Sequence, residues 1–219
     1  SRRVQTSAGS DAPRSGTSGD DATVPVAIAG PRALGYFSGS RGIVSVSRMA
    51  QAAPTETRYT STRYFQLVAE GLLRPDDRIE LLEGVIVAMA PENPPHASAT
   101  ARVQAALADA IGKRAVIRGQ LPLVASAYSV PEPDVAVVPG QMADYDSVHP
   151  MTALLVVEVA DSSLVQDRLT KSAIYAGAGV PEYWLVNLRD DCVEVFRSPD
   201  RRARSYGESR VARRGERLD

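Results

Sequence analysis

The sequence contains a single cysteine, Cys192, which excludes an internal disulfide bond. A chain with one free thiol is typical of a reducing compartment, so we expect a cytoplasmic protein. No run of apolar residues reaches the ~18 that a helix needs to cross a bilayer. The sequence therefore predicts neither a disulfide-stabilised secreted protein nor a protein that contacts a membrane.

Neither sign of charge predominates, because 25 Lys and Arg residues face 26 Asp and Glu residues. With a formal net charge of −1, the chain has no global basic field, and a polyanion would have to bind through a local patch. Aromatic residues are also scarce, at 5%, so the hydrophobic core must be built from Val, Leu, Ile and Ala.

The first 57 residues differ in composition from the rest. Ser, Gly, Ala, Arg and Pro predominate there without helical or strand periodicity, which predicts a disordered N-terminal extension over 1–57. Residues 58–219 are enough for one sizeable domain. Met49 is a candidate natural start, and the chain stops at Asp219 with no evident closing element, which suggests a truncated C-terminal end.

Hydrophobic periodicity and turn residues predict a mixture of helices and strands. Thr60 has the side chain of a helix N-cap, and Glu83-Gly84 indicates a turn between two strands. The other expected elements are helices at His96–Ile111 and Ser163–Ala178 and strands at Ala115–Arg118, Leu121–Ala127, Met151–Ala160, Val180–Leu188 and Cys192–Arg197. The basic segment after Arg201 is expected to be a solvated tail or, alternatively, a phosphate-binding patch.

Two apolar, Val-rich runs each carry one carboxylate. Asp134 opens the run from Pro133 to Val138, and Glu158 lies in the run from Leu154 to Ala160. Such runs are typical of strands buried on both faces, where a charge is costly. If the strands are neighbours, the two carboxylates converge and offer the oxygen ligands that Mg²⁺ or Mn²⁺ prefers. Alternatively, Asp134 only starts a turn and Glu158 is an edge or ion-paired residue.

Three other residues are candidates for the same site. Lys171 lies in an apolar stripe with Ile174 and Tyr175, where its ammonium group is expected to reach the sheet or, alternatively, to extend into solvent. Glu80 lies inside an apolar strand, and His96 lies near a helix N-terminus. Either could be an accessory residue of the site or an ordinary exposed residue.

The order of these segments forms a recognisable pattern. The segments are Arg78-Ile79-Glu80-Leu81-Leu82-Glu83-Gly84, Met89-Ala90-Pro91, His96, Pro133-Asp134-Val135, Val157-Glu158-Val159-Ala160-Asp161-Ser162-Ser163, Lys171 with Tyr175, and Gly179-Val180-Pro181-Glu182-Tyr183-Trp184-Leu185-Val186-Asn187. Over about Thr60 to Leu218, this ordered set resembles the Uma2 family of restriction endonuclease-like proteins, within the PD-(D/E)XK nuclease superfamily.

The resemblance implies an α/β, restriction-endonuclease-like fold, with a central mixed β-sheet flanked by helices. It implies that Asp134 and Glu158 are catalytic, metal-binding acids and that Glu80 is an accessory ligand. The superfamily pattern places a lysine where this chain has Ala160, so the resemblance assigns the catalytic lysine to Lys171 instead. It further implies Mg²⁺ or Mn²⁺ as cofactor, nucleic acid as substrate, with DNA favoured, and a homodimer.

These features together predict a metal-dependent endonuclease that hydrolyses phosphodiester bonds. A bound Mg²⁺ would polarise a phosphate oxygen and activate water, and Lys171 would stabilise the developing charge. One alternative is a catalytically inactive nuclease-fold module that binds nucleic acid or a partner, which fits the displaced lysine. Another is a two-carboxylate hydrolase such as a glycosidase, although the low aromatic content argues against a sugar-binding cleft.

Overall fold

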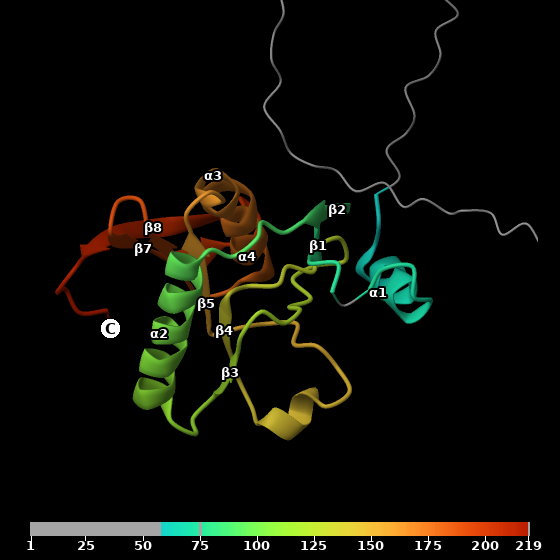
Figure 1. Ribbon diagram of the computed structural model, residues 1–219, viewed down its shortest axis with the longest axis horizontal. Coiled ribbons are helices and arrows are strands. Elements are labelled where there is room, and N and C mark those ends of the chain that lie inside the picture. The colour runs from blue at the N-terminus through green and yellow to red at the C-terminus, as the bar shows by residue number, and fades with distance from the viewer. Residues whose placement is uncertain (1–57, 75, 219) are drawn as a thin grey trace, which may run out of the picture.

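The computed structural model describes residues 58–74 and 76–218. The predicted disordered extension over 1–57, including Met49, lies outside the described residues. Figure 1 shows a mixed α/β arrangement in which a central sheet lies between helices, with a smaller hairpin beside it. The fold therefore belongs to the α/β class that the sequence predicts.

Helices and strands alternate irregularly along the chain. The helical elements are α1 (Ser61–Ala69), α2 (Pro94–Ile111), η1 (Met142–Tyr145), α3 (Leu164–Gln166), η2 (Asp167–Lys171) and α4 (Ser172–Ala178). The strands are β1 (Ile79–Leu82), β2 (Val85–Ala88), β3 (Val116–Arg118), β4 (Val135–Val138), β5 (Leu155–Ala160), β6 (Glu182–Asn187), β7 (Cys192–Asp200) and β8 (Ser205–Arg213).

Six strands form one mixed sheet in the order β3-β4-β5-β6-β7-β8, while β1 and β2 form a separate antiparallel hairpin. Every residue of β4 and β5 is buried, as their Val-rich sequences predict. β4 and β5 are antiparallel, whereas β5 and β6 are parallel. A parallel pair needs a long crossover, which the helical run α3–η2–α4 supplies.

Helices cover both faces of the sheet (Figure 1). On one face, Leu107 of α2 packs in a cluster with Val135 and Val157. On the other face, Ile174 and Tyr175 of α4 pack against the opposite side of β4, β5 and β6. Helix α1 instead packs against the β1–β2 hairpin. Leu82 of the hairpin belongs to the same cluster as α4. The crossover helix and the hairpin therefore lie on the face of the sheet toward which Asp134 and Glu158 point, because side chains alternate along a strand.

Several local predictions are confirmed. The Thr60 side chain accepts a hydrogen bond from the Arg63 N–H at 3.1 Å and caps α1. Glu83 and Gly84 both have positive φ, 53° and 84°, and connect β1 to β2 in a tight turn. Gly179 ends α4 in the left-handed conformation, with φ 79°.

The prediction of a strand over Leu121–Ala127 is wrong. The Leu123 N–H bonds to the Pro131 carbonyl, and the Val124 N–H bonds to the Pro150 carbonyl, each at 2.9 Å. Because successive N–H groups pair with different loops, no ladder forms, although the segment is apolar and extended. The strand expected at Met151–Ala160 likewise begins only at Leu155.

The basic C-terminal segment is not a solvated tail. It forms β8, which pairs with β7 over nearly its whole length and closes one edge of the sheet. Ala212 is buried there, while the arginines of β8 are exposed. Charged side chains on an edge strand discourage pairing with other chains, which is why a strand can look like a tail in sequence.

Helix α2 begins at Pro94, two residues earlier than predicted. Proline lacks an N–H group, but the first N–H groups of a helix have no partner within the helix, so Pro94 and Pro95 fit its first turn. The Asn93 side chain caps the helix by accepting from the His96 N–H at 3.0 Å. Among the described residues, no helix is long and apolar enough to cross a bilayer.

Candidate active site

Asp134 and Glu158 meet because β4 and β5 are neighbours. Val135 pairs with Val157, so Asp134, just before β4, lies next to Glu158 in β5. The Asp134 carboxylate atom Oδ2 accepts the Val159 N–H at 2.7 Å, which fixes it against β5. Both carboxylates are buried, with exposures of 7% and 3%. The convergence that the sequence predicts is therefore present.

Two side chains of the crossover helix contact the Glu158 carboxylate. Its atom Oε1 accepts the Tyr175 hydroxyl at 2.5 Å and lies 3.1 Å from Lys171 Nζ. Burial raises the pKa of Glu158 well above its ordinary value, and nearby Asp134 raises it further, while Lys171 opposes both. Burial and the Glu158 carboxylate also raise the pKa of Tyr175, so the hydroxyl stays protonated and donates.

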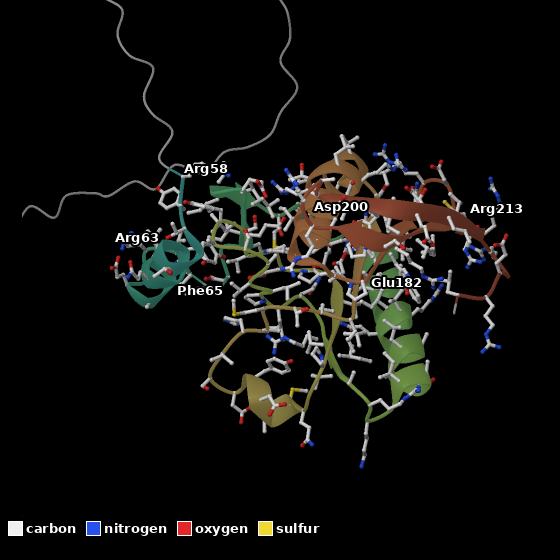
Figure 2. The ribbon with its side chains drawn as sticks, turned by 180° about the vertical axis from the view of Figure 1, so that it is seen from behind. Arg58, Arg63, Phe65, Glu182, Asp200 and Arg213 are labelled. Carbon is white, nitrogen blue, oxygen red and sulfur yellow. The ribbon has the colours of Figure 1, made fainter. Side chains whose placement is uncertain are left out.

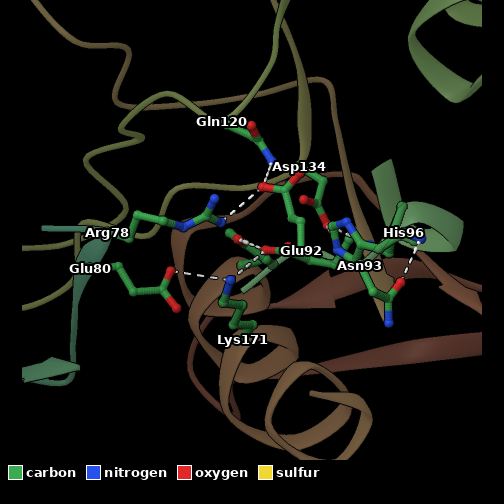
Figure 3. Close-up of polar contacts among 11 residues, drawn as sticks. Arg78, Glu80, Glu92, Asn93, His96, Gln120, Asp134 and Lys171 are labelled. Atoms are coloured by element: carbon green, nitrogen blue, oxygen red, sulfur yellow. Dashed lines mark hydrogen bonds and ion pairs between the residues drawn. The ribbon is translucent and has the colours of Figure 1, made fainter. Parts of the chain in front are cut away.

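Lys171 links the helix to both the sheet and the hairpin. Its ammonium Nζ lies 3.1 Å from Glu80 Oε2 as well as 3.1 Å from Glu158 Oε1, as Figure 3 shows for Glu80. Burial alone would lower the pKa of Lys171, but the surrounding carboxylates raise it well above its ordinary value. The lysine therefore keeps its charge, and it points toward the sheet as its place in the apolar stripe predicts.

The helix carries a π turn, η2, at the point where it reaches the site. A π turn contains one more residue than an α turn and is often found at functional sites. It brings both Asp167 and Lys171 into the buried face, with exposures of 3% and 5%. Asp167 and Lys171 are four residues apart, so both lie on the helix face that is turned toward the site.

His96 lies at the N-terminus of α2 and approaches Asp134 from the other side of the site (Figure 3). Its atom Nε2 is 3.3 Å from Asp134 Oδ2, while Nδ1 is buried and has no hydrogen-bond partner among the described residues. The hydrogen bond with Asp134 raises the pKa of His96. The accessory candidates are thus both in place, with Glu80 beside Lys171 and His96 beside Asp134.

Two further acids that the sequence reading missed lie in the site. The Glu132 N–H donates to Glu80 Oε2 at 3.2 Å, and burial together with Glu80 raises the pKa of Glu132 to about 7. Burial also raises the pKa of Asp167. The signals available in sequence were modest: Glu132 lies two residues before Asp134, and Asp167 lies four residues before Lys171.

A chain of polar contacts borders the buried carboxylates around Lys171, which we call the carboxylate cluster. Arg78 donates to Glu92 at 2.8 Å, and Gln120 donates to the same carboxylate oxygen. Arg78 lies just before β1, Glu92 lies in the loop before α2, and Gln120 lies just after β3. Figure 3 shows these three side chains in one group with Asp134 and Lys171. They connect the segments that surround the carboxylates.

The carboxylates of this site fit Mg²⁺, which needs few protein ligands, better than a metal ion that is coordinated entirely by protein side chains. Among the described residues, no three His, Cys, Asp or Glu side chains are gathered closely enough to coordinate one ion. Mg²⁺, however, is commonly bound by one or two carboxylates, with waters and substrate phosphate completing its shell. Asp134 Oδ1 and Glu158 Oε2 form no hydrogen bond with the described protein, while the other oxygen of each carboxylate is held.

The architecture matches that of a solved structure. The crystal structure of a protein from Anabaena variabilis ATCC 29413, described as "a putative nuclease belonging to DUF820", matches with a TM-score of 0.55 and 16% identity. The match covers 69% of this chain and 83% of the other. At this identity it establishes the fold, which is restriction-endonuclease-like. No protein with a curated description matches the sequence.

The family follows from the sequence match. The model of the Uma2 family, whose description is "Putative restriction endonuclease", matches residues 62–219. This range contains Glu80, His96, Asp134, Glu158 and Lys171, and with them every element from β1 to β8. The chain belongs to the Uma2 family, as the pattern of its segments predicts.

Proposed function

We propose that this chain is a metal-dependent endonuclease that hydrolyses phosphodiester bonds of nucleic acid, with DNA as the expected substrate. The observation that carries the proposal is the convergence of Asp134, Glu158 and Lys171 at one buried point between β4, β5 and the crossover helix. The family description and the fold support the same class of reaction.

Asp134 and Glu158 would hold the Mg²⁺ or Mn²⁺ ion through the carboxylate oxygens that they leave unused. When bound, such an ion polarises a phosphate oxygen and lowers the pKa of a coordinated water. Without it, the carboxylates around Lys171 would repel an anionic phosphodiester, so the proposal requires a metal.

The protein's own residues position these groups. The Tyr175 hydroxyl and the Val159 N–H fix one oxygen of Glu158 and of Asp134, so each carboxylate can turn only its other oxygen outward. Lys171 carries a positive charge between the Glu80 and Glu158 carboxylates, and it would stabilise the negative charge that builds on the phosphate. Glu80 keeps the Lys171 ammonium at this point.

The proposal is tested by titrating Mg²⁺ or Mn²⁺ into the protein by calorimetry, together with a plasmid-nicking assay on the same samples. We expect the wild-type protein to bind the ion and to nick, and Asp134→Ala to lose both properties while keeping its thermal melting transition. Nicking that persists in excess chelator would contradict the metal requirement.

The same experiment separates the rival function. Nucleic-acid binding without ion binding or nicking would identify a non-catalytic nuclease-fold module, which the full pairing of Lys171 with two carboxylates favours. The preference for DNA and the homodimer that the family resemblance implies stay predictions. Nicking compared on DNA and RNA of one sequence tests the first, and light scattering tests the second.

A further inference from the structure

A hollow of about 360 Å³ lies outside the carboxylate site, between the β1–β2 turn, the C-terminal end of α4 and the turn after β7. The side chains that matter here are Arg58, Glu83, Tyr128, Arg201 and Arg204, all of which line it. Figure 2 labels Arg58 and also Asp200, the last residue of β7, which leads into the turn with Arg201 and Arg204. Three guanidinium groups and one carboxylate therefore line the same hollow.

Each of the three arginines that line the hollow contacts a glycine. A Cβ atom at Gly84 would come 2.8 Å from Arg58, one at Gly177 would come 3.4 Å from Arg204, and one at Gly179 would come 3.1 Å from Arg201. Gly84 and Gly179 also have positive φ, which itself favours glycine.

Gly177 is different, because it lies inside α4, where glycine weakens a helix. A Cβ atom there would meet Arg204 only at an ordinary van der Waals distance. The close approaches of arginine to glycine backbone in the hollow are therefore those of Arg58 at Gly84 and Arg201 at Gly179.

The charge in the hollow is only partly neutralised. Arg204 donates to both oxygens of Glu83, at 2.9 and 2.6 Å, and Arg58 lies 3.7 Å from the same carboxylate. Arg201 has no carboxylate within 4.0 Å in the described chain, and its one hydrogen bond is a long contact of 3.5 Å with the Gly177 carbonyl. Arg201 is therefore a positioned guanidinium group that is free to bind an anion.

An aromatic ring borders this charge. Tyr128 is 42% exposed, and the Arg58 guanidinium carbon lies 5.0 Å from the centre of its ring. The hollow thus combines an exposed aromatic ring with arginine side chains. Arginines that track phosphates and aromatic rings that stack on bases are the two components of single-strand binding surfaces.

The hollow is connected to the carboxylate site by two elements. Lys171 and Gly177 lie about 9 Å apart along the crossover helix at the usual helical rise. Glu80 and Glu83 lie about 10 Å apart along β1 and its turn at the usual strand rise. The hollow therefore lies close to the carboxylate site, at the far ends of the same two elements.

We propose that this hollow binds a single-stranded segment of the nucleic-acid substrate close to the phosphodiester bond that is cleaved. Arg201, with Arg58, binds a backbone phosphate, and Tyr128 stacks on a base. The inference rests on the proposed function, since it takes the substrate to be a polynucleotide. It adds a positioning site that none of the carboxylate residues provides.

The test compares two adjacent arginines. Arg201 lines the hollow, whereas Arg202 is exposed in the same turn and does not. Binding of a fluorescent oligothymidylate to the full chain is measured by anisotropy in chelator, so that no cleavage occurs, at several salt concentrations. We expect Arg201→Gln to weaken binding about tenfold and to reduce the slope of log affinity against log salt by about 0.7, the value for one phosphate contact on a single strand.

Arg202→Gln should change affinity less than twofold and leave the slope unaltered. Tyr128→Leu should weaken binding without changing the slope, because stacking releases no counterions. Equal effects of Arg201→Gln and Arg202→Gln would overturn the inference, as would a wild-type protein that nicks plasmid but does not bind the oligonucleotide. Binding through Arg201 by a protein that never nicks would support the hollow and overturn the proposed catalysis instead.

Discussion

Lys171 balances the buried charges of the candidate site. It is the residue that pairs with both Glu80 and Glu158, and all three side chains are almost completely buried. A buried ion pair contributes little net stability compared with an apolar pair, but removal of one partner leaves an uncompensated charge. The lysine therefore matters for folding as well as for the proposed reaction.

Lys171→Met should lower the free energy of unfolding by about 3–5 kcal/mol, because Glu80 and Glu158 would lose their shared cation. Urea denaturation measures this loss. Lys113→Met, at an exposed position, is the matched control and should change stability by less than about 0.5 kcal/mol. Adding Glu158→Gln to Lys171→Met should recover part of the loss, and a purely additive double mutant would contradict the coupling.

The Tyr175 hydroxyl should have a smaller but measurable role. Tyr175→Phe keeps the ring that packs on Tyr183 but removes the donor to Glu158 Oε1. We expect a loss of about 1–3 kcal/mol, since a buried acceptor loses its partner, and weaker Mg²⁺ binding because Glu158 is no longer fixed. Tyr128→Phe, which removes a hydroxyl at an exposed ring, should change neither property.

At the scale of elements, the start of α2 and the crossover helix position the site. Asn93 caps α2 and so places His96 beside Asp134, while the helical run α3–η2–α4 brings Lys171 to Glu158. Capping and helical periodicity are both local properties of the chain, and here each directs a side chain toward the site.

Asn93→Ala should destabilise the protein by about 1 kcal/mol and reduce nicking, because the His96 N–H loses its acceptor and the start of α2 frays. Asn93→Ser restores an N-cap acceptor and should recover most of the stability in a thermal or urea melt. If the two variants behaved alike, the cap would not be what positions His96.

At the scale of the whole molecule, the hairpin and the end of the sheet are joined by ion pairs. Arg204, in the turn between β7 and β8, binds Glu83 in the turn between β1 and β2, more than a hundred residues away in sequence. This contact connects the small hairpin, which carries Glu80, to the six-stranded sheet, which carries Glu158. It keeps the two halves of the candidate site in register.

The ion pair predicts a pH dependence of stability. Its hydrogen bonds with Arg204 lower the pKa of Glu83 below its ordinary value of 4.5. A lowered folded-state pKa means that the stabilisation is present above about pH 4.5 and is lost as the pH falls through the folded-state value.

Because Glu83 is 37% exposed, the effect should be no more than about 1 kcal/mol. Urea midpoints of the wild type and of Glu83→Gln should therefore differ at neutral pH and converge in acid. In an Arg204→Gln background this difference should be smaller, because Glu83 then keeps, within the described chain, only its contacts with Arg58 and Ser129.

Local features of the sequence determined many of the helices, strands and turns of this protein. The Val-rich runs around Asp134 and Glu158, the cap at Thr60, the turn at Glu83-Gly84 and the stripe that holds Lys171 all depend on residues within a few positions of one another. Their physical causes, which are β-branched packing, side-chain capping, positive φ and helical periodicity, act over that same range.

Other features of the fold and of the site were decided only by tertiary structure, because they depend on which distant segments pair. Leu121–Ala127 is apolar like a strand, but its N–H groups find partners in separate loops, whereas the basic segment after Arg201 looks solvated and yet pairs with β7. Glu132 entered the site through the path of a loop, and Asp167 entered it because the crossover helix packs its buried face toward the carboxylates. Pairing across the sheet brought the acids, the lysine and the histidine to one point, and no local signal encodes that arrangement.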